Sequence, residues 1–307
     1  MTEIFLRTVP FFLVIGLGYA AARGRLFHGA AVAALTKFVF YFALSAMLFD
    51  FSSTLPFAEI FNRDLALAYL IATALVYAVV TIVALRRGTG LAEAAVEAQC
   101  GVIGNIGFLG LPMLIVLIGP QAAGPIILML AVDLIVFGSL IVAIIVGSRE
   151  KGGLLKIPYR IIVGLIKNPM IMSIASGLAW SYLALPVPRA MDDFLDLLGG
   201  AATPCALFAI GASLADKSAE RFSVALWLST AKLLLHPVAV AVFTLLVFDL
   251  PREIAAVIIA SAAMPVAGNI YIVAQHYGVA PARVSSAILV STVLSVVTLT
   301  LAIALVS

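Results

Sequence analysis

The sequence predicts an all-α polytopic membrane protein with ten transmembrane helices, arranged as two inverted five-helix repeats. Three observations lead to this fold class. Hydrophobic residues make up 64% of the 307 residues and charged residues only 11%, unlike a soluble domain. Apolar runs long enough to span the ~30 Å of hydrocarbon in a bilayer recur along the whole chain. Two of these runs are interrupted by glycine, proline and asparagine in a similar way.

The apolar runs account for almost the whole chain and leave no room for a soluble domain. The first run begins without basic residues, so we expect it to be a retained span and not a cleaved signal peptide. The fourth run is long enough for a helix that unwinds midway. The predicted spans cover residues 4–22, 30–49, 65–85, 91–118, 124–147, 162–185, 191–215, 223–247, 254–275 and 285–306.

Positive charges assign the two sides of the membrane. Most lysines and arginines outside the spans follow spans 1, 3, 5, 7 and 9. By the positive-inside rule this side is cytoplasmic, so both termini are expected on the extracytoplasmic side of the cell (inner) membrane. The cytoplasmic group is Arg23, Arg25, Arg86, Arg87, Arg149, Lys151, Lys156, Arg160, Lys167, Lys217, Arg221 and Arg283. The smaller opposite group is Arg7, Arg63, Arg189 and Arg252.

The two halves of the chain share short sequences at nearly one offset. Asn105 and Asn269 are 164 residues apart, and residues 42–46 (FALSA) resemble residues 208–212 (FAIGA) at an offset of 166. This predicts two repeats, residues 1–150 and residues 151–307. Because each repeat has an odd number of spans, the second must enter the membrane upside down. Spans 4 and 9 then become symmetry mates whose interruptions meet near the bilayer midplane.

The interruptions in spans 4 and 9 predict a binding site. Residues 104–112 read GNIGFLGLP, and residues 264–271 read MPVAGNIY. A helix that begins in mid-membrane presents N–H groups equivalent to about half a positive charge, and two such ends facing each other suit an anion. The alternative is that the glycines permit close helix packing while the asparagines satisfy freed backbone groups. The predicted substrate-binding residues are Asn105, Asn269, Gly104, Gly107, Pro112, Pro265 and Gly268.

Ionisable side chains deep inside spans are functional candidates, because each costs about 2.5–3.5 kcal/mol on insertion scales. Asp133 and Lys232 each lie nine residues into a span, ~14 Å deep. They would pair statically with each other, or Asp133 would carry a proton or help to hold Na⁺. His236 precedes Pro237 and would relay protons or bond a carbonyl that the proline frees.

Two further charged residues lie inside the spans. Glu97 shares a helical face with Gly104 and Asn105, about two turns away on the cytoplasmic side, and is a candidate for proton coupling. Lys37 lies only about 10 Å deep, so we expect its side chain to reach the cytoplasmic surface.

Two other classes of membrane protein compete with a carrier. Midplane helix breaks also build pores, so an anion channel is one alternative. Asp192, Asp193 and Asp196 match DDxxD, the Mg²⁺-diphosphate motif of prenyl-transfer enzymes. However, no second Asp-rich segment occurs, and acidic residues at a helix start favour the helix dipole. We therefore expect neither an enzyme nor a metal site.

The motif of residues 104–112, together with ten spans and an outward N-terminus, resembles the auxin efflux carrier family. This family, which includes plant PIN proteins, belongs to the bile-acid/arsenite/riboflavin transporter superfamily. Asn168-Pro169, residues 232–237 and residues 265–269 fit the same family, so the resemblance covers essentially the whole chain. PIN proteins carry a long cytoplasmic loop between their halves. This chain lacks the loop, which indicates a minimal bacterial-type member.

The resemblance implies a secondary active transporter of mono- or dicarboxylates such as malonate, malate or auxin-like acids. The carboxylates would bind beside the crossing of spans 4 and 9. An elevator-type motion would move a transport core of spans 3–5 and 8–10 against a scaffold of spans 1, 2, 6 and 7. The carrier would be a homodimer in the lipid bilayer. No cofactor and no nucleic acid are expected, and H⁺ and Na⁺ are the candidate coupling ions.

Overall fold

Helices make up the regular structure of the chain, which the computed structural model describes at residues 2–54, 62–149, 157–215 and 222–306. The predicted repeat boundary at residues 150 and 151 lies outside these described residues. The same holds for four of the predicted cytoplasmic charges, Lys151, Lys156, Lys217 and Arg221.

In the first half of the chain, π-helical turns connect several consecutive helices without a loop between them. Asn62 caps the N-terminus of α5, because its side chain accepts a hydrogen bond from the Leu65 amide at 3.0 Å. The elements are α1 (Thr2–Arg23), α2 (Gly29–Phe38), η1 (Val39–Ala43), α3 (Leu44–Thr54), α5 (Arg63–Arg86), α6 (Leu91–Val102), η2 (Ile106–Gly110), α7 (Leu111–Ile118), η3 (Pro120–Ala122), α8 (Ala123–Val132), η4 (Asp133–Phe137) and α9 (Gly138–Arg149).

The second half begins with a sharp bend. α10 and α11 meet at 73°, where Asn168 caps α11 by accepting a hydrogen bond from Met170 N at 3.0 Å and Pro169 takes the first helical position. The elements are α10 (Ile157–Lys167), α11 (Pro169–Tyr182), α12 (Arg189–Gly200), α13 (Ala202–Leu214), α14 (Phe222–Thr230), η6 (Ala231–Leu235), α15 (His236–Val242), η7 (Phe243–Val247), α16 (Arg252–Ala262), α17 (Asn269–Tyr277) and α18 (Pro281–Val306).

Length and composition make the chain a multi-pass membrane protein. Among the described residues, six helical runs are long and apolar enough to cross a membrane, and a seventh is if the bent pair α10–α11 counts as one. The predicted all-α class is confirmed at this level. Spans 91–118 and 254–275 are each divided into two shorter helices. The six runs are Gly29–Thr54, Arg63–Arg86, Pro120–Ser148, Arg189–Leu214, Phe222–Val247 and Pro281–Ala304.

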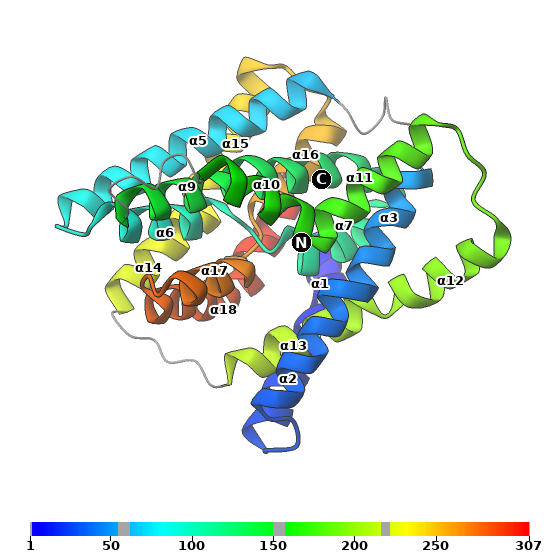
Figure 1. The fold of residues 1–307 in the computed structure, drawn as a ribbon, viewed down its shortest axis with the longest axis horizontal. Helices are drawn as coiled ribbons and strands as arrows, with labels where there is room; N and C mark the ends of the chain where they lie inside the picture. The colour runs from blue at the N-terminus through cyan, green and yellow to red at the C-terminus, as the bar shows by residue number, and fades with distance from the viewer. Residues whose placement is uncertain (1, 55–61, 150–156, 216–221, 307) are drawn as a thin grey trace.

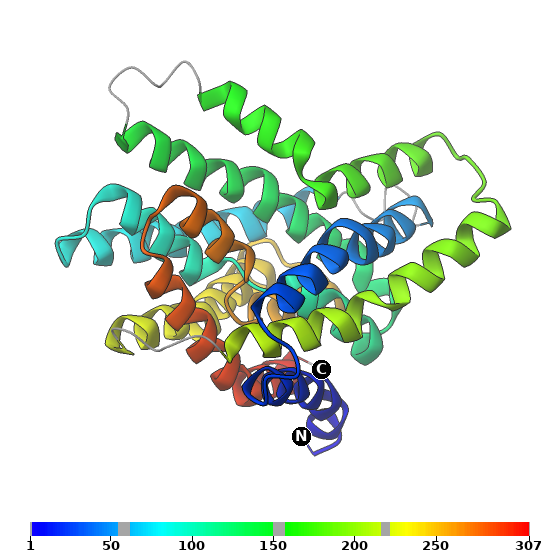
Figure 2. The ribbon, with the colours of Figure 1, turned by 60° about the horizontal axis from the view of Figure 1, so that its bottom comes forward.

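The helices pack together in two groups, each of which combines helices from both halves of the chain (Figure 1). In one group α1 packs along α13, and α3 packs along α11 and α12. In the other, α5 packs on α6, α14 on α18, and α15 on both α5 and α16. The first and last helices, α1 and α18, also contact each other, and the two ends of the chain lie near each other in Figure 2.

Glycines permit the closest contacts in the first group. A Cβ atom on Gly211 of α13 would collide with the backbone carbonyl of Ile15 in α1, and one on Gly18 of α1 would collide with the carbonyl of Phe208. Inside a membrane the hydrophobic effect does not drive helices together, so close backbone approach through small residues is a main source of their association. The α1–α13 crossing therefore depends on these two glycines.

Replacing Gly211 with alanine is expected to destabilise the protein by about 1–3 kcal/mol, because the added methyl group forces α1 and α13 apart. Gly16→Ala in α1 is the matched control, since a Cβ atom there meets nothing within 4 Å. Thermal unfolding of both variants in detergent measures the difference. Equal unfolding temperatures for the two variants would contradict the close crossing.

Candidate functional site

The first interruption lies between α6 and η2. The backbone at Ile103 is extended, with φ −83° and ψ 113°, and helical turns resume with η2. Gly104 lies in the gap, where a Cβ atom would be 3.1 Å from Nζ of Lys232 and 3.3 Å from Cβ of Met264. Glycine therefore lets the backbone pass close to two side chains from the second half of the chain.

This interruption is shorter than the motif that predicted it. The motif extends to Pro112, but helical turns resume at Ile106, and Pro112 lies at the start of α7. Proline has no N–H group to continue the helical ladder, and the π-helical turn η2 directly before it accommodates the missing donor within the helical run Ile106–Ile118. Pro112 thus shapes the second half of the broken helix and does not open the gap.

The second interruption lies between α16 and α17, at residues 263–268. Pro265 has no N–H group to continue the helical ladder of α16. The amide of the next residue, Val266, donates to Oγ of Ser291 in α18 at 3.0 Å. The role of Ser291 could not be predicted from the sequence, because a serine in an apolar helix does not show which distant amide it will bond.

The two interrupted segments cross and bond to each other. The amide of Asn105 donates to the carbonyl of Pro265 at 2.7 Å, and the amide of Ala267 donates to the carbonyl of Ile103 at 3.1 Å. Between these bonds Gly104 and Val266 form an isolated antiparallel bridge. Each segment thereby satisfies polar backbone groups of the other in a place without water. The structure thus brings together the two motifs at corresponding positions.

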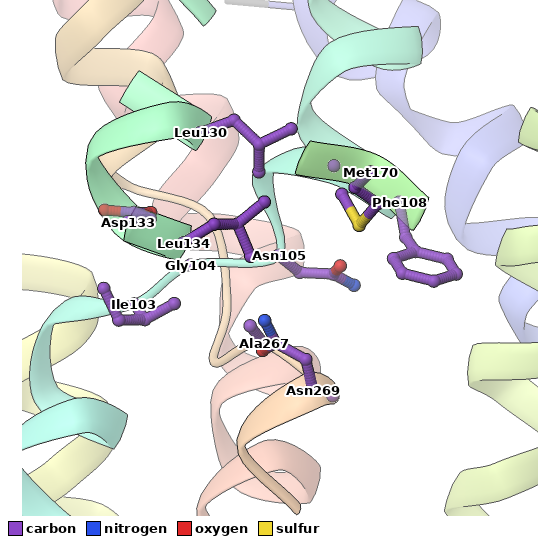
Figure 3. Close-up of a pocket in the computed structure, with 12 residues that line it drawn as sticks. Ile103, Gly104, Asn105, Phe108, Leu130, Asp133, Leu134, Met170, Ala267 and Asn269 are labelled. Atoms are coloured by element: carbon purple, nitrogen blue, oxygen red, sulfur yellow. The ribbon is translucent and has the colours of Figure 1, made fainter. Parts of the chain in front are cut away.

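A small cavity borders the crossing (Figure 3). Its volume is about 20 Å³, room for about one water molecule. The side chains of Asn105 and Asn269 project into this space from the two segments, and Asp133 of η4 also borders it. Of the predicted binding residues, Pro112 and Pro265 do not line it. The lining residues are Ile103, Gly104, Asn105, Gly107, Phe108, Leu130, Asp133, Leu134, Met170, Ala267, Gly268 and Asn269.

Two helix N-termini begin at this cavity. One is the helical run Ile106–Ile118, and the other is α17, which starts at Asn269. The first N–H groups of a helix have no intrahelical carbonyl to bond, and they give this end a partial positive charge. The cavity therefore combines two positive helix ends with two neutral amide side chains, an arrangement suited to a small anion.

A buried polar network lies behind the crossing. The Tyr69 hydroxyl of α5 donates to Asp133 Oδ1 at 2.7 Å. Lys232 Nζ lies 3.2 Å from Nδ1 of His236, and Thr73 Oγ1 lies 3.0 Å from Nε2 of the same ring. All five side chains are at most 3% exposed. Tyr69 and Thr73 were not predicted to belong to the site. Their spacing of four residues on one face of an apolar helix could have indicated that this face meets other polar groups.

Asp133 and Lys232 are not a simple ion pair. Lys232 also donates to the carbonyl of Ala262, at the C-terminal end of α16. That end of a helix carries partial negative charge, so the ammonium group stabilises the carbonyl groups where α16 stops. Asp133 is bonded to Tyr69 through Oδ1, while its Oδ2 is buried without a hydrogen-bond partner.

Glu97 lies away from the cavity, in a cluster with charged residues of two other elements. Its carboxylate, which is 1% exposed, forms ion pairs with Arg87 after α5 and with Arg283 of α18, the latter at 2.5 Å. Arg283 also reaches Glu93, at 3.3 Å. The cluster ties the first half of the broken helix to α5 and α18.

Glu97→Gln is expected to destabilise the protein by about 1.5–3 kcal/mol, because the buried carboxylate bonds both Arg87 and the largely buried Arg283, and its loss leaves Arg283 with only the exposed Glu93. Glu93→Gln is the matched control. Its side chain is 43% exposed and belongs to a longer ion pair, so its loss is expected to cost about 0–1 kcal/mol. Thermal unfolding of both variants measures the two losses of stability. A loss for Glu97→Gln that is no larger than the loss for Glu93→Gln would contradict a stabilising role of the Glu97 cluster.

The DDxxD sequence lies at the N-terminal end of α12. Asp192 lies in the first turn of α12, where a carboxylate favours the helix dipole. Within the described parts of the chain, no group of three or more His, Cys, Asp and Glu residues is arranged to hold a metal ion.

Comparisons with known proteins point in one direction. Residues 3–303 match the model of a family described as membrane transport protein. The chain is also 33% identical over 312 residues to a protein of Rhizobium meliloti (strain 1021) named "Putative malonate transporter". That similarity covers 98% of this chain and 95% of the relative.

Proposed function

The chain belongs to the membrane transport protein family, the auxin efflux carrier family that its motifs resemble, and we propose that it is a secondary active transporter of small organic anions. Membership makes the protein a membrane transporter and not an enzyme. The observation that carries the proposal is the crossing of two interrupted helices beside a cavity lined by Asn105 and Asn269. Helix N-termini and amide groups bind a carboxylate without a resident cation.

Each predicted binding residue has a physical role in this proposal. Asn105 and Asn269 donate hydrogen bonds to substrate carboxylate oxygens. Gly107 and Gly268 keep the two helix starts free of side chains, and Gly104 permits the crossing itself. Pro265 accepts the bond that fixes Asn105, and Pro112 begins α7 behind the site. Neutral ligands of this kind bind weakly enough to release the substrate again, as a carrier requires.

The proposed substrates are mono- or dicarboxylates such as malonate, malate or auxin-like acids. The similarity to the Rhizobium meliloti protein makes malonate the first compound to test. The cavity of about 20 Å³ is smaller than any of these acids. Binding then requires the walls to open, which is what alternating access provides.

The proposed architecture is ten spans in two inverted repeats, residues 1–150 and residues 151–307. The helix contacts support it, because they occur in equivalent pairs. Contacts between spans 1 and 7 match those between spans 2 and 6 (α1–α13 and α3–α11). Contacts between spans 3 and 4 match those between spans 8 and 9 (α5–α6 and α15–α16). An even number of spans puts both termini on one side, which we assign to the extracytoplasmic face.

The two groups of helices then correspond to the fixed scaffold and the moving transport core of an elevator-type carrier. Spans 1, 2, 6 and 7, held by the glycine crossing of α1 and α13, form the scaffold. Spans 3–5 and 8–10 form the core that carries the crossing, and the scaffold would join two protomers in a homodimer. Of the candidates for coupling to H⁺ or Na⁺, we favour Asp133 with Lys232 and His236, because arginines hold the carboxylate of Glu97.

Transport by the purified protein in liposomes tests the proposal. We expect saturable uptake of labelled malonate that is stimulated by unlabelled malonate inside the vesicles, because a carrier returns faster when it is loaded. Protein-free liposomes are the control. Large unitary anion currents without this stimulation would instead assign the protein as a channel.

A further inference from the structure

The candidate cavity contains hydrogen-bond acceptors that an ionised carboxylate ligand, which has no donor, cannot satisfy. Asp133, which is 3% exposed, lines it, and among the described residues its Oδ2 atom has no hydrogen-bond partner. Oδ1 of Asn269 is also buried there without a partner. Carboxylate oxygens accept hydrogen bonds and donate none. A fully ionised ligand would therefore leave Oδ2 of Asp133 unsatisfied and would be repelled by an ionised Asp133.

The groups that face Asp133 do not meet this need themselves. From α5, Tyr69 already donates to Oδ1, and the hydroxyl of Thr73 lies beside His236. From η6 and α15, Lys232 and His236 bond each other, and Lys232 also donates to the Ala262 carbonyl. Among the described residues these groups leave Oδ2 without a donor, so a water molecule or a ligand group that enters the cavity would supply it.

The nature of that donor follows from the neighbouring charge. A metal cation would satisfy the acceptors, but the ammonium group of Lys232 lies behind Gly104, 3.1 Å from where a Cβ atom would be, and repels it. A carboxylic acid O–H group carries no net charge and makes a strong hydrogen bond to a carboxylate. Two carboxyl groups in a buried site also share one proton readily, because both cannot be ionised at short range.

We propose that the site takes a dicarboxylate together with one proton, shared between one substrate carboxyl group and Asp133 Oδ2, while the second carboxylate faces the helix N-termini. This inference rests on the proposed function and names the form in which its substrate is bound. No covalent bond changes. One proton and one dianion enter the site, and the complex has the charge that a monoanion would bring.

Malonate binding across pH tests the proposal in the purified protein. Uptake of one proton with each dianion predicts that affinity falls about tenfold per pH unit once free malonate and Asp133 are both ionised. In Asp133→Asn, the side-chain amide donates without a proton from solution, so malonate should bind with little dependence on pH. The proposal would be overturned if the wild type bound malonate with the same affinity at the lowest and the highest pH measured.

Two malonate analogues test the same point without a variant. Malonamate keeps one carboxylate and offers a permanent N–H donor, whereas monomethyl malonate keeps one carboxylate and offers no donor. At alkaline pH, malonamate should compete about 10–100-fold better than monomethyl malonate, the value of a hydrogen bond to a charged group. Equal competition by the two would overturn the proposal. Absence of binding and uptake for all three acids at every pH would instead refute the transport function itself.

Discussion

Asn105→Ala and Asn269→Ala are each expected to weaken malonate binding by about 10–100-fold. Each variant removes one hydrogen-bond donor to a charged carboxylate, an interaction worth about 1.5–3 kcal/mol. Alanine at either position has no polar group that could replace the lost amide donor. The double variant is expected to lose saturable uptake. Thermal shift of each purified variant with and without malonate measures its malonate affinity.

The chain offers a matched control for these two variants. Asn62 is also an asparagine, but its side chain caps α5 and does not line the cavity. Asn62→Ala should lower stability by about 1 kcal/mol and leave the malonate affinity unchanged. The site assignment fails if both Asn105→Ala and Asn269→Ala fold normally and take up malonate like the wild type.

Lys232→Met is expected to lower the free energy of unfolding by about 3–5 kcal/mol, the usual cost of removing one partner from a buried charged network. Methionine fills a similar volume, so the loss reports on charge and hydrogen bonding more than on packing. The ammonium group bonds the carbonyl of Ala262 where α16 stops, and the membrane interior supplies no replacement donor. Its removal also leaves Asp133 without a nearby positive charge.

Lys37→Met is the control for this substitution. Lys37 belongs to α2 and is exposed, so its replacement is expected to change stability by no more than about 0.5 kcal/mol. Thermal unfolding in detergent compares the two variants directly. If Lys232→Met unfolds at the same temperature as Lys37→Met, the buried network does not stabilise the crossing.

The sequence predicted the parts of the site that depend on local chemistry. Glycine, proline and asparagine have backbone effects that can be recognised without knowing their neighbours, so both interruptions were expected. The extent of the first interruption could not be predicted in this way: the motif reaches Pro112, but helical turns resume at Ile106, because a π-helical turn can accommodate a proline that lacks an N–H group.

The partners of the charged residues could not be predicted in the same way. Glu97 faces the crossing by helical periodicity, yet its carboxylate bonds Arg283, which is 186 residues away. Tyr69 and Asp133 are likewise 64 residues apart. Such pairs depend on how distant helices pack, and a single sequence contains no direct record of that. For Lys232, an ion pair with Asp133 was one of the expected alternatives, and its bond to the Ala262 carbonyl at the end of α16 could not be predicted for the same reason.

The distance between bound malonate and the asparagine side chains tests the central claim most directly. The chain has only four asparagines, and Asn62 and Asn168 are helix caps. In membranes containing protein labelled with ¹⁵N at asparagine side chains and malonate labelled with ¹³C at its carboxyl groups, solid-state NMR measures this distance. We expect carbon–nitrogen couplings for Asn105 and Asn269 that correspond to about 4 Å, the separation across a hydrogen bond, and none for the two caps. Saturable malonate binding without coupling to Asn105 and Asn269 would contradict a carboxylate site at the crossing.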